Sequence, residues 1–130
     1  MDRAILERRL ALFSIVAAIL HFIGETWVHL AMGQFLPMLI VDYIAIGLLL
    51  FGGTRSLQTR QGAGLLCGAW GFTFCLNYRA LFWRVGVLLE EGGDAALETM
   101  TQVLGGLFLV SMLAFLLSLY LCLPREEETS

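Results

Sequence analysis

Two histidines and a glutamate recur at every fourth position in the first apolar run of the sequence, as His21, Glu25 and His29. Four residues advance an α-helix by about 40° beyond a full turn, so these side chains would share one helix face. Imidazole and carboxyl groups are common general acids and bases, and ionisable groups at membrane depth usually line a site or a cavity. The spacing therefore predicts a buried polar cluster that is able to transfer protons.

The composition predicts that this cluster lies inside a membrane protein. Of the 130 residues, 58% are hydrophobic and 15% are charged, which is more apolar surface than a soluble domain of this size can bury. The sequence has no basic patch, which argues against nucleic acid as a partner. All 8 basic residues are arginine, which indicates a GC-rich bacterial genome, and the cysteines form no C-x-x-C pair that would indicate a redox loop or a zinc finger.

Four apolar runs have the length that a helix needs to cross the roughly 30 Å hydrocarbon core of a bilayer. We expect spans at about residues 10–31, 37–53, 62–84 and 99–123, within one domain over residues 1–130. Short links between the spans favour an all-α integral membrane protein, a four-transmembrane-helix up-down-up-down bundle. We expect Gly52 and Gly53 to stop the second helix, because glycine commonly follows the last helical residue.

The distribution of charge predicts how the bundle is oriented. Arginines precede the first span and lie between the second and third, at Arg55 and Arg60, whereas the link at residues 90–98 is acidic. Because basic loops tend to stay in the cytoplasm, we expect the N- and C-termini to be cytoplasmic and the acidic link to lie outside. The protein would then be a multi-pass protein of the cytoplasmic (inner) membrane.

The first predicted helix has one small, polar face and one bulky, apolar face. Ser14 and Ala18 lie on the same side as His21 and Glu25. A helix with this pattern packs through its small face and turns its bulky face to lipid. The residues that we expect to contact lipid are Leu20, Ile23, Trp27 and Leu30.

The third predicted helix carries a seam of small residues, Gly64, Gly68 and Gly71. Such a seam allows another helix to approach closely, either within the chain or in a homo-oligomer. Arg79 sits beside the seam, so we expect it to point into the protein. Arg84 lies on nearly the opposite face, and we expect it to anchor the helix at the outer membrane interface.

Counting from the helix midpoints at about 1.5 Å per residue places four polar side chains in one layer of the outer half of the membrane. The layer contains Glu25, Asp42, Asn77 and Arg79, with His21 below it and His29 above it. Arg79 would stabilise one ionised carboxyl, and the second carboxyl would stay protonated beside the first. Such a difference separates acid and base roles, and the histidines would relay protons to the outer face.

We interpret this layer as the site of a membrane-embedded enzyme that acts on, or binds, a lipophilic small molecule or lipid. Glu25, His21 and Asp42 would be the catalytic groups of an isomerase, a cyclase or a hydrolase. The side chains expected to orient the substrate or to shape its pocket are Asn77, Arg79, Tyr78, Trp70 and His29. This interpretation requires no metal and no cofactor.

The pattern His21-x-x-x-Glu25 in a membrane helix, followed by further acids and by Asn77 on later helices, resembles the EXPERA-type membrane proteins. Those proteins include sterol isomerases and sterol-binding relatives. The resemblance implies that His21 and Glu25 handle protons and that Asn77 lines a pocket. It covers these positions alone, and the chain is shorter than those proteins usually are.

Other interpretations remain open. Four spans with one carboxyl in the first, Glu25, resemble the small multidrug resistance exporters, which would imply a proton-coupled transporter. Ala18-Ile-Leu is similar to their first helix, whereas Asn77-Tyr-Arg is unlike their glycine-rich packing motif. Alternatively, His21 and Glu25 could share a metal ion with Asp42, or one histidine could bind haem. Finally, the polar layer could serve only to join helices, for example in a non-catalytic accessory subunit of a membrane complex.

Overall fold

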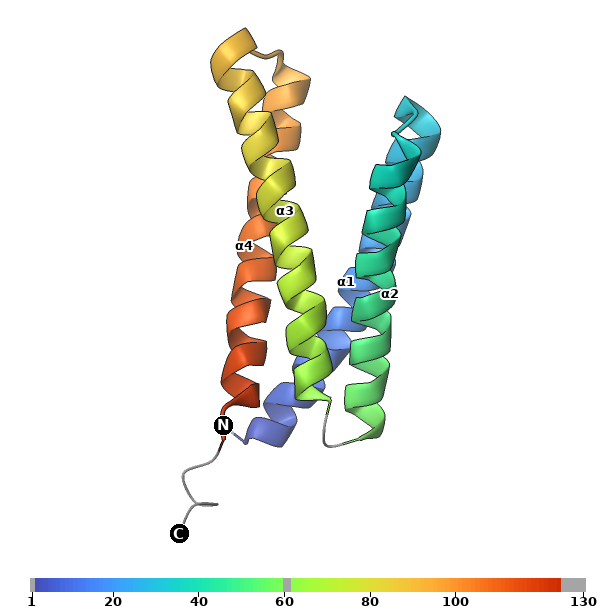
Figure 1. Cartoon of the computed structure of the whole chain (residues 1–130), viewed down its shortest axis with the longest axis vertical. Helices are drawn as coiled ribbons and strands as arrows, with labels where there is room; N and C mark the ends of the chain where they lie inside the picture. Colours follow the sequence, from blue (N-terminus) through green and yellow to red (C-terminus); the bar gives the residue numbers. More distant parts are fainter. Residues whose placement is uncertain (1, 60–61, 125–130) are drawn as a thin grey trace.

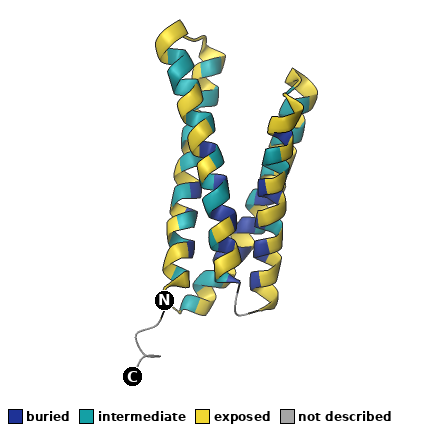
Figure 2. Ribbon diagram, in the orientation of Figure 1, coloured by how far each residue is buried: buried dark blue, intermediate teal, exposed yellow. Residues whose placement is uncertain are grey.

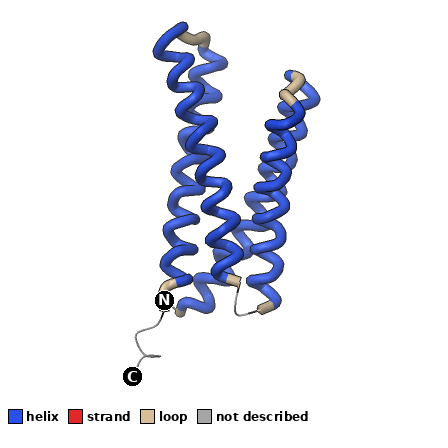
Figure 3. Tube along the Cα trace, in the orientation of Figure 1, coloured by secondary structure: helices blue, strands red, loops and turns tan. Residues whose placement is uncertain are grey.

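The computed structural model describes residues 2–59 and 62–124. Its four helices are α1 (Arg3–Met32), α2 (Leu36–Gln58), α3 (Ala63–Glu91) and α4 (Ala95–Cys122), and successive helices run in opposite directions (Figure 1). Figure 3 shows that helices and short loops make up the whole of the described chain. The prediction of an all-helical protein with four helices is therefore confirmed.

Length and composition make this fold compatible with a membrane. Within the described residues, α1, α2 and α4 are the helices that are long and apolar enough to cross a bilayer. α3 is 29 residues long, but its second half carries Asn77, Arg79 and Arg84, which lower its apolar character. Arg60, on which the predicted orientation partly depends, lies outside the described residues.

Capping groups explain where two of the helices begin and where one ends. The Asp2 carboxylate accepts a hydrogen bond from the backbone N–H of Ala4 at 3.1 Å, and Asp94 accepts one from the backbone N–H of Leu97 at 2.9 Å. These bonds satisfy backbone donors that the first turns of α1 and α4 leave free. α1 ends at Gly33, whose φ of 69° is a left-handed conformation that glycine adopts at little cost.

The expected stop of the second helix at Gly52 and Gly53 is wrong, because α2 continues to Gln58. Both glycines are buried where neighbouring helices approach α2 closely. A Cβ atom on Gly52 would lie 3.3 Å from the backbone of Leu65 in α3, and one on Gly53 would lie 2.9 Å from the carbonyl oxygen of Ala11 in α1. The glycine pair is therefore a small-residue contact among three helices.

The helices form two antiparallel pairs that meet near one end of the molecule (Figure 1). α1 packs along α2, and α3 packs along α4, while α2 and α3 connect the pairs and α1 contacts α3 and α4 much less. We call the end that holds the start of α1 and the end of α4 the convergent end. The opposite end, where the α1–α2 and α3–α4 links lie and the pairs separate, is the divergent end.

The hydrophobic core lies towards the convergent end, where Figure 2 shows the buried residues to be concentrated. All four helices contribute to it, through Leu10, Ala11, Ala18, Ile46, Leu49, Leu66, Ala69, Trp70 and Ala114. Among the described residues, α1 has no buried residue after Ala18 and α4 has none before Ser111. The divergent end is therefore held by packing within each helix pair.

Polar contacts between helices reinforce the convergent end. Trp70 of α3 donates a hydrogen bond from Nε1 to Oγ of Ser14 in α1 at 2.8 Å, and its ring stacks on Phe13 with 5.6 Å between centroids. Ser56 of α2 donates a hydrogen bond from Oγ to the Glu7 carboxylate of α1 at 2.6 Å. Buried indole and hydroxyl groups need such partners in an apolar interior.

The beginning of α1 is attached to the end of α4. Arg3 donates a hydrogen bond from Nη1 to the carbonyl oxygen of Leu123 at 2.9 Å. Its guanidinium carbon also lies 4.7 Å from the centroid of the Tyr120 ring, within the range of a cation–π contact. The two ends of the described chain therefore meet at the convergent end.

The predicted faces of α1 are confirmed. Ser14 and Ala18 are fully buried at 0% exposure, and His21 and Glu25 on the same face are half-buried. The bulky face is exposed along its length, at Leu20, Ile23, Trp27 and Leu30.

The small-residue seam of α3 faces away from the rest of the chain over most of its length. Gly64 and Gly68 are exposed, and a Cβ atom on either would meet nothing within 4 Å. At Gly71 the added atom would lie 3.0 Å from the ring of Phe115 in α4. The seam therefore leaves two glycines open, and its proposed use in a homo-oligomer stays a prediction.

Candidate functional site

His21, Glu25 and Asp42 form a cluster of titratable side chains between α1 and α2. One donor atom from each residue lies within 4.8 Å of the donor atoms of the other two. Nε2 of His21 is 3.5 Å from Oε1 of Glu25, one helical turn further along α1. All three residues are half-buried. The structure thus brings together the three residues that the sequence indicated as catalytic.

Contacts between α1 and α2 next to the cluster fix its geometry. Oγ1 of Thr26 and the hydroxyl of Tyr43 share a hydrogen bond of 2.8 Å, and the ring of Tyr43 lies 5.4 Å from that of Phe22 between centroids. These three residues are the immediate sequence neighbours of His21, Glu25 and Asp42. The contacts set the register of the two helices and so hold Asp42 opposite the α1 pair.

Gln34, in the link between α1 and α2, is a member of the site that the sequence did not reveal. Its Nε2 donates a hydrogen bond to Oδ2 of Asp42 at 3.3 Å. Its Oε1 is buried and has no hydrogen-bond partner among the described residues. The sequence feature that could have indicated Gln34 is its position in the three-residue link between α1 and α2. Because so short a link returns α2 directly alongside the end of α1, its polar side chain lies close to both helices.

His29 lies one turn beyond Glu25 on α1 and is not part of the three-residue cluster. The ring is half-buried, and its Nδ1 is buried without a hydrogen-bond partner in the described part of the chain. His21 and His29 are separated by about 12 Å along the helix axis, which is eight residues at about 1.5 Å each. His29 therefore flanks the cluster on the side of the divergent end, and its position towards the outer face of a membrane stays a prediction.

Two predicted ligand-binding residues have structural contacts elsewhere in the bundle. Asn77 is buried in α3 and donates from Nδ2 to the carbonyl oxygen of Leu107 at 3.3 Å and to Oγ of Ser111 at 3.2 Å, both in α4. Trp70 belongs to the core and is paired with Ser14. The contacts of both side chains join helices, and neither side chain is part of the cluster.

Arg79 and Tyr78 are exposed on α3, so the expectation that Arg79 points into the protein is wrong. The physical reason is the helical angle: Arg79 lies about 200° around the helix from Asn77, which is buried against α4. Tyr78 instead joins an aromatic group with Phe82 and Phe108, at centroid distances of 4.6 and 6.1 Å. Arg79 is therefore not the cation that balances the carboxyls.

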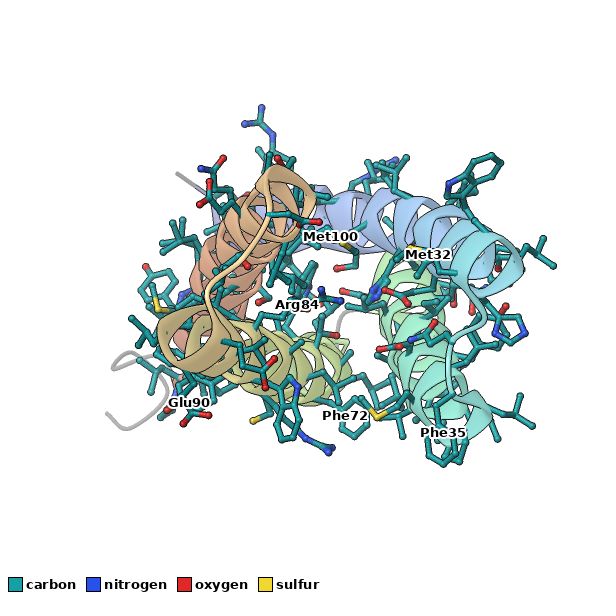
Figure 4. The ribbon with its side chains drawn as sticks, turned by 90° about the horizontal axis from the view of Figure 1, so that it is seen from above. Met32, Phe35, Phe72, Arg84, Glu90 and Met100 are labelled. Carbon is teal, nitrogen blue, oxygen red and sulfur yellow. The ribbon has the colours of Figure 1, made fainter. Side chains whose placement is uncertain are left out.

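Arg84 occupies the inward position that the sequence analysis assigned to Arg79. It lies two turns beyond Asn77 on the same face of α3, is half-buried, and points towards the middle of the four helices (Figure 4). Its Nη1 donates to the sulfur of Met100 in α4 at 3.8 Å, which is a weak acceptor for a guanidinium with five N–H donors. Arg84 follows Asn77 by seven residues, which is about two helical turns, so the sequence already places both side chains on one face of α3.

The charges of the cluster are incompletely balanced. In residues 2–59 and 62–124, the one ion pair within 4.0 Å joins His21 and Glu25, so no arginine pairs with Glu25 or Asp42. Two carboxyls therefore share one imidazole. In a region of low dielectric such a set would bind at least one proton or another cation to reduce its charge.

An apolar groove of about 350 Å³ lies between α1 and α4, and it does not adjoin the cluster. Leu10, Phe13 and Leu113 contribute to its walls, and Arg9 is its one charged lining residue. Phe13 precedes His21 by about 12 Å along α1, counted as eight residues at about 1.5 Å each. The groove belongs to the convergent end.

No family model matches the chain, and neither the curated proteins nor the solved structures compared with it give a match. The resemblances to EXPERA-type proteins and to small multidrug resistance exporters therefore rest on the few residues that suggested them. The function must therefore be inferred from the geometry of His21, Glu25 and Asp42 and from the residues around them.

Proposed function

We propose that the protein is a multi-pass protein of the cytoplasmic membrane that binds a lipophilic small molecule beside the His21–Glu25–Asp42 cluster and transfers protons to or from it. The single observation that carries this proposal is the convergence of three titratable side chains from two helices within 4.8 Å. Ionisable groups are costly at membrane depth, and their grouping on one face favours a functional site over separate packing contacts.

All four helices would cross the membrane as one domain, with the N- and C-termini in the cytoplasm. Two polar groups of α3 are compatible with a span, because Asn77 bonds to α4 and Arg84 points towards the middle of the four helices. The exposed Arg79 would have to extend its charged end towards the membrane interface. The arginines before the first span and between the second and third spans, together with the acidic residues between the third and fourth, favour this orientation. The cluster would then lie in the outer half of the membrane.

The chemistry proposed for the cluster is general acid/base catalysis of the isomerase, cyclase or hydrolase type. Glu25, in contact with His21, and Asp42, bonded to Gln34, have different partners and so can hold different protonation states. One carboxyl would deliver a proton to a carbonyl, alkene or epoxide, and the other would accept one. Arg84, and not Arg79, would bind the polar end of the molecule.

Native mass spectrometry of protein gently extracted from its own membrane tests this proposal. Wild type should retain an apolar molecule that Glu25→Gln loses or holds in altered amount. Glu90→Gln makes the same chemical change at an exposed carboxyl near the end of α3 and should retain the molecule. Retention that is equal in all three proteins, or no bound molecule in wild type, would contradict the proposed ligand site.

A proton-coupled transporter is the second candidate, and the half-buried state of the cluster favours it, because a transport site must exchange protons with water. Flux in proteoliposomes that needs a proton gradient and disappears in Glu25→Gln would support transport. Turnover in detergent without a gradient would support the enzyme. Co-purification with larger proteins, with neither activity, would identify an accessory subunit.

A further inference from the structure

The charge of the cluster and the environment of its members point to a cation. Glu25 and Asp42 contribute two carboxyl groups, and the predicted counter-charge, Arg79, is exposed on another helix. Within 4.0 Å among the described residues, Glu25 has the His21 imidazole as its ionic partner and Asp42 has none. A divalent cation between them would cancel this charge, and a neutral imidazole is the form of histidine that binds metals.

The distances suit a small metal ion. Two ligands of one tetrahedral ion, each about 2.1 Å from it, lie roughly 3.4 Å apart. Nε2 of His21 and Oε1 of Glu25 are 3.5 Å apart, which matches one such edge. One Asp42 oxygen lies within 4.8 Å of a donor atom of each of the other two residues, so a side-chain shift of roughly 1–2 Å would complete a three-ligand face.

Gln34 provides a second, independent observation. Its amide nitrogen holds Asp42, as the groups that orient metal-binding carboxylates commonly do. Its amide oxygen is buried and has no hydrogen-bond partner within the described residues. An oxygen in that state, attached to a residue that already contacts one ligand, is suited to coordinate a cation or to accept a hydrogen bond from a water on it.

We propose that His21, Glu25 and Asp42 bind one divalent transition-metal ion, with Gln34 supporting Asp42. One nitrogen and two carboxylate ligands suit zinc, iron or manganese, whereas calcium and magnesium prefer oxygen ligands alone. With a cation bound, Glu25 and Asp42 would serve as ligands instead of exchanging protons, and the cation would act as a Lewis acid towards an oxygen of a bound molecule. Metal binding is a property separate from the proposed function, because the ion can bind to these side chains whether or not a lipophilic molecule is present.

Cobalt(II) titration of the purified, chelator-treated protein in detergent, followed by visible absorption and zinc competition, tests the inference. Wild type should bind about one ion per chain. Glu25→Gln and Asp42→Asn should each weaken binding by more than about 100-fold, and Gln34→Ala by about tenfold, as expected for direct ligands and for a supporting residue. Glu90→Gln should bind as wild type does. Far-ultraviolet circular dichroism and size-exclusion elution identify any variant that has not folded.

If the variants that remove a metal-binding side chain unfold, a variant that adds a new spectroscopic band still tests the metal site. His21→Cys replaces the imidazole with a thiolate, so its cobalt complex should show a thiolate-to-metal charge-transfer band in the near ultraviolet. Wild type carries the same native cysteines, Cys67, Cys75 and Cys122, and is the matched background. Absence of the band in a folded, cobalt-loaded His21→Cys protein, or unchanged affinity in Asp42→Asn, would overturn the metal site.

The experiments distinguish failure of the metal site from failure of the proposed binding of a lipophilic molecule. A retained apolar molecule in wild type without metal binding would overturn the metal site and leave the proposed function standing. Stoichiometric metal binding without any apolar molecule would support the metal site and contradict the proposed ligand.

Discussion

Polar side chains in or beside the core at the convergent end have partners on other helices, whereas several at the divergent end have incomplete sets of partners. Trp70 and Ser14 pair at 2.8 Å, and Ser56 and Glu7 at 2.6 Å, within or beside the core. At the divergent end, Arg84 bonds to a methionine sulfur, and the Gln34 amide oxygen has no partner among the described residues.

This difference separates groups that stabilise the fold from groups that are available to a ligand. Satisfied polar pairs between helices contribute to association, and they give no reason to expect another molecule. Half-satisfied groups in a polar cluster carry a cost that binding of a ligand or a cation would offset. The comparison therefore favours the divergent end as the place of the proposed function, and mutations at the two ends should affect different measurements.

The largest loss of stability is expected from Trp70→Ala. The side chain is 2% exposed and stacks on Phe13, so its removal leaves a cavity and deprives Ser14 of a hydrogen-bond donor. We expect the free energy of unfolding to fall by about 3 kcal/mol. Unfolding in mixed detergent measures this value, and Trp27→Ala, at a residue that is 72% exposed, should change it by less than about 0.5 kcal/mol. Equal losses in the two variants would mean that the core is not at the convergent end.

A smaller loss is expected from Gly53→Ala. The new methyl group would lie 2.9 Å from the carbonyl oxygen of Ala11 and 2.8 Å from a side-chain carbon of Ile15, so α1 and α2 must move apart. We expect a loss of about 1–2 kcal/mol after the gain in helix propensity is included. Gly68→Ala meets nothing within 4 Å and should be neutral or stabilising, by up to about 1 kcal/mol. A destabilised Gly68→Ala would indicate that the open seam packs against another copy of the chain.

The smallest change in stability is expected from Arg84→Gln, at the divergent end. Its contact with Met100 is weak, so the free energy of unfolding should change by less than about 0.5 kcal/mol. Retention of the apolar molecule in native mass spectrometry should fall clearly in Arg84→Gln and stay at the wild-type level in Arg79→Gln, whose side chain is exposed. The reverse result would restore the original assignment of Arg79 to the site.

The sequence was sufficient to predict four helices and the convergence of His21, Glu25 and Asp42, although it placed the end of α2 wrongly. Helical pitch alone puts His21 and Glu25 on one face. The short link between α1 and α2 then returns the chain so that Asp42 lies opposite them. These relations are local, and for that reason they could be read without a structure.

The face through which α3 packs could not be read in this way. From the sequence, both its glycine seam and its Trp70–Asn77 stripe are expected to pack against protein, since small residues favour close helix contact and polar residues need partners. The choice depends on which neighbours offer matching groups, and Ser14 and Ser111 provide them for Trp70 and Asn77. Because α3 packs through the Trp70–Asn77 face, Arg84 points inward and Arg79 is exposed. Gln34 was missed because a neutral link residue gives no periodic signal.

The contact between Arg3 and Leu123 makes the described chain nearly circular. A short linker across that contact, with new termini opened between α2 and α3, would give a permuted protein in the order α3, α4, α1, α2. Every helix would keep its direction, and each antiparallel pair would remain continuous in sequence. Permutation is usually tolerated where the joined ends lie close together at the surface. The same reasoning allows the gene to be divided in two at that link, so that the two pairs are made as separate polypeptides and assemble afterwards in the bilayer.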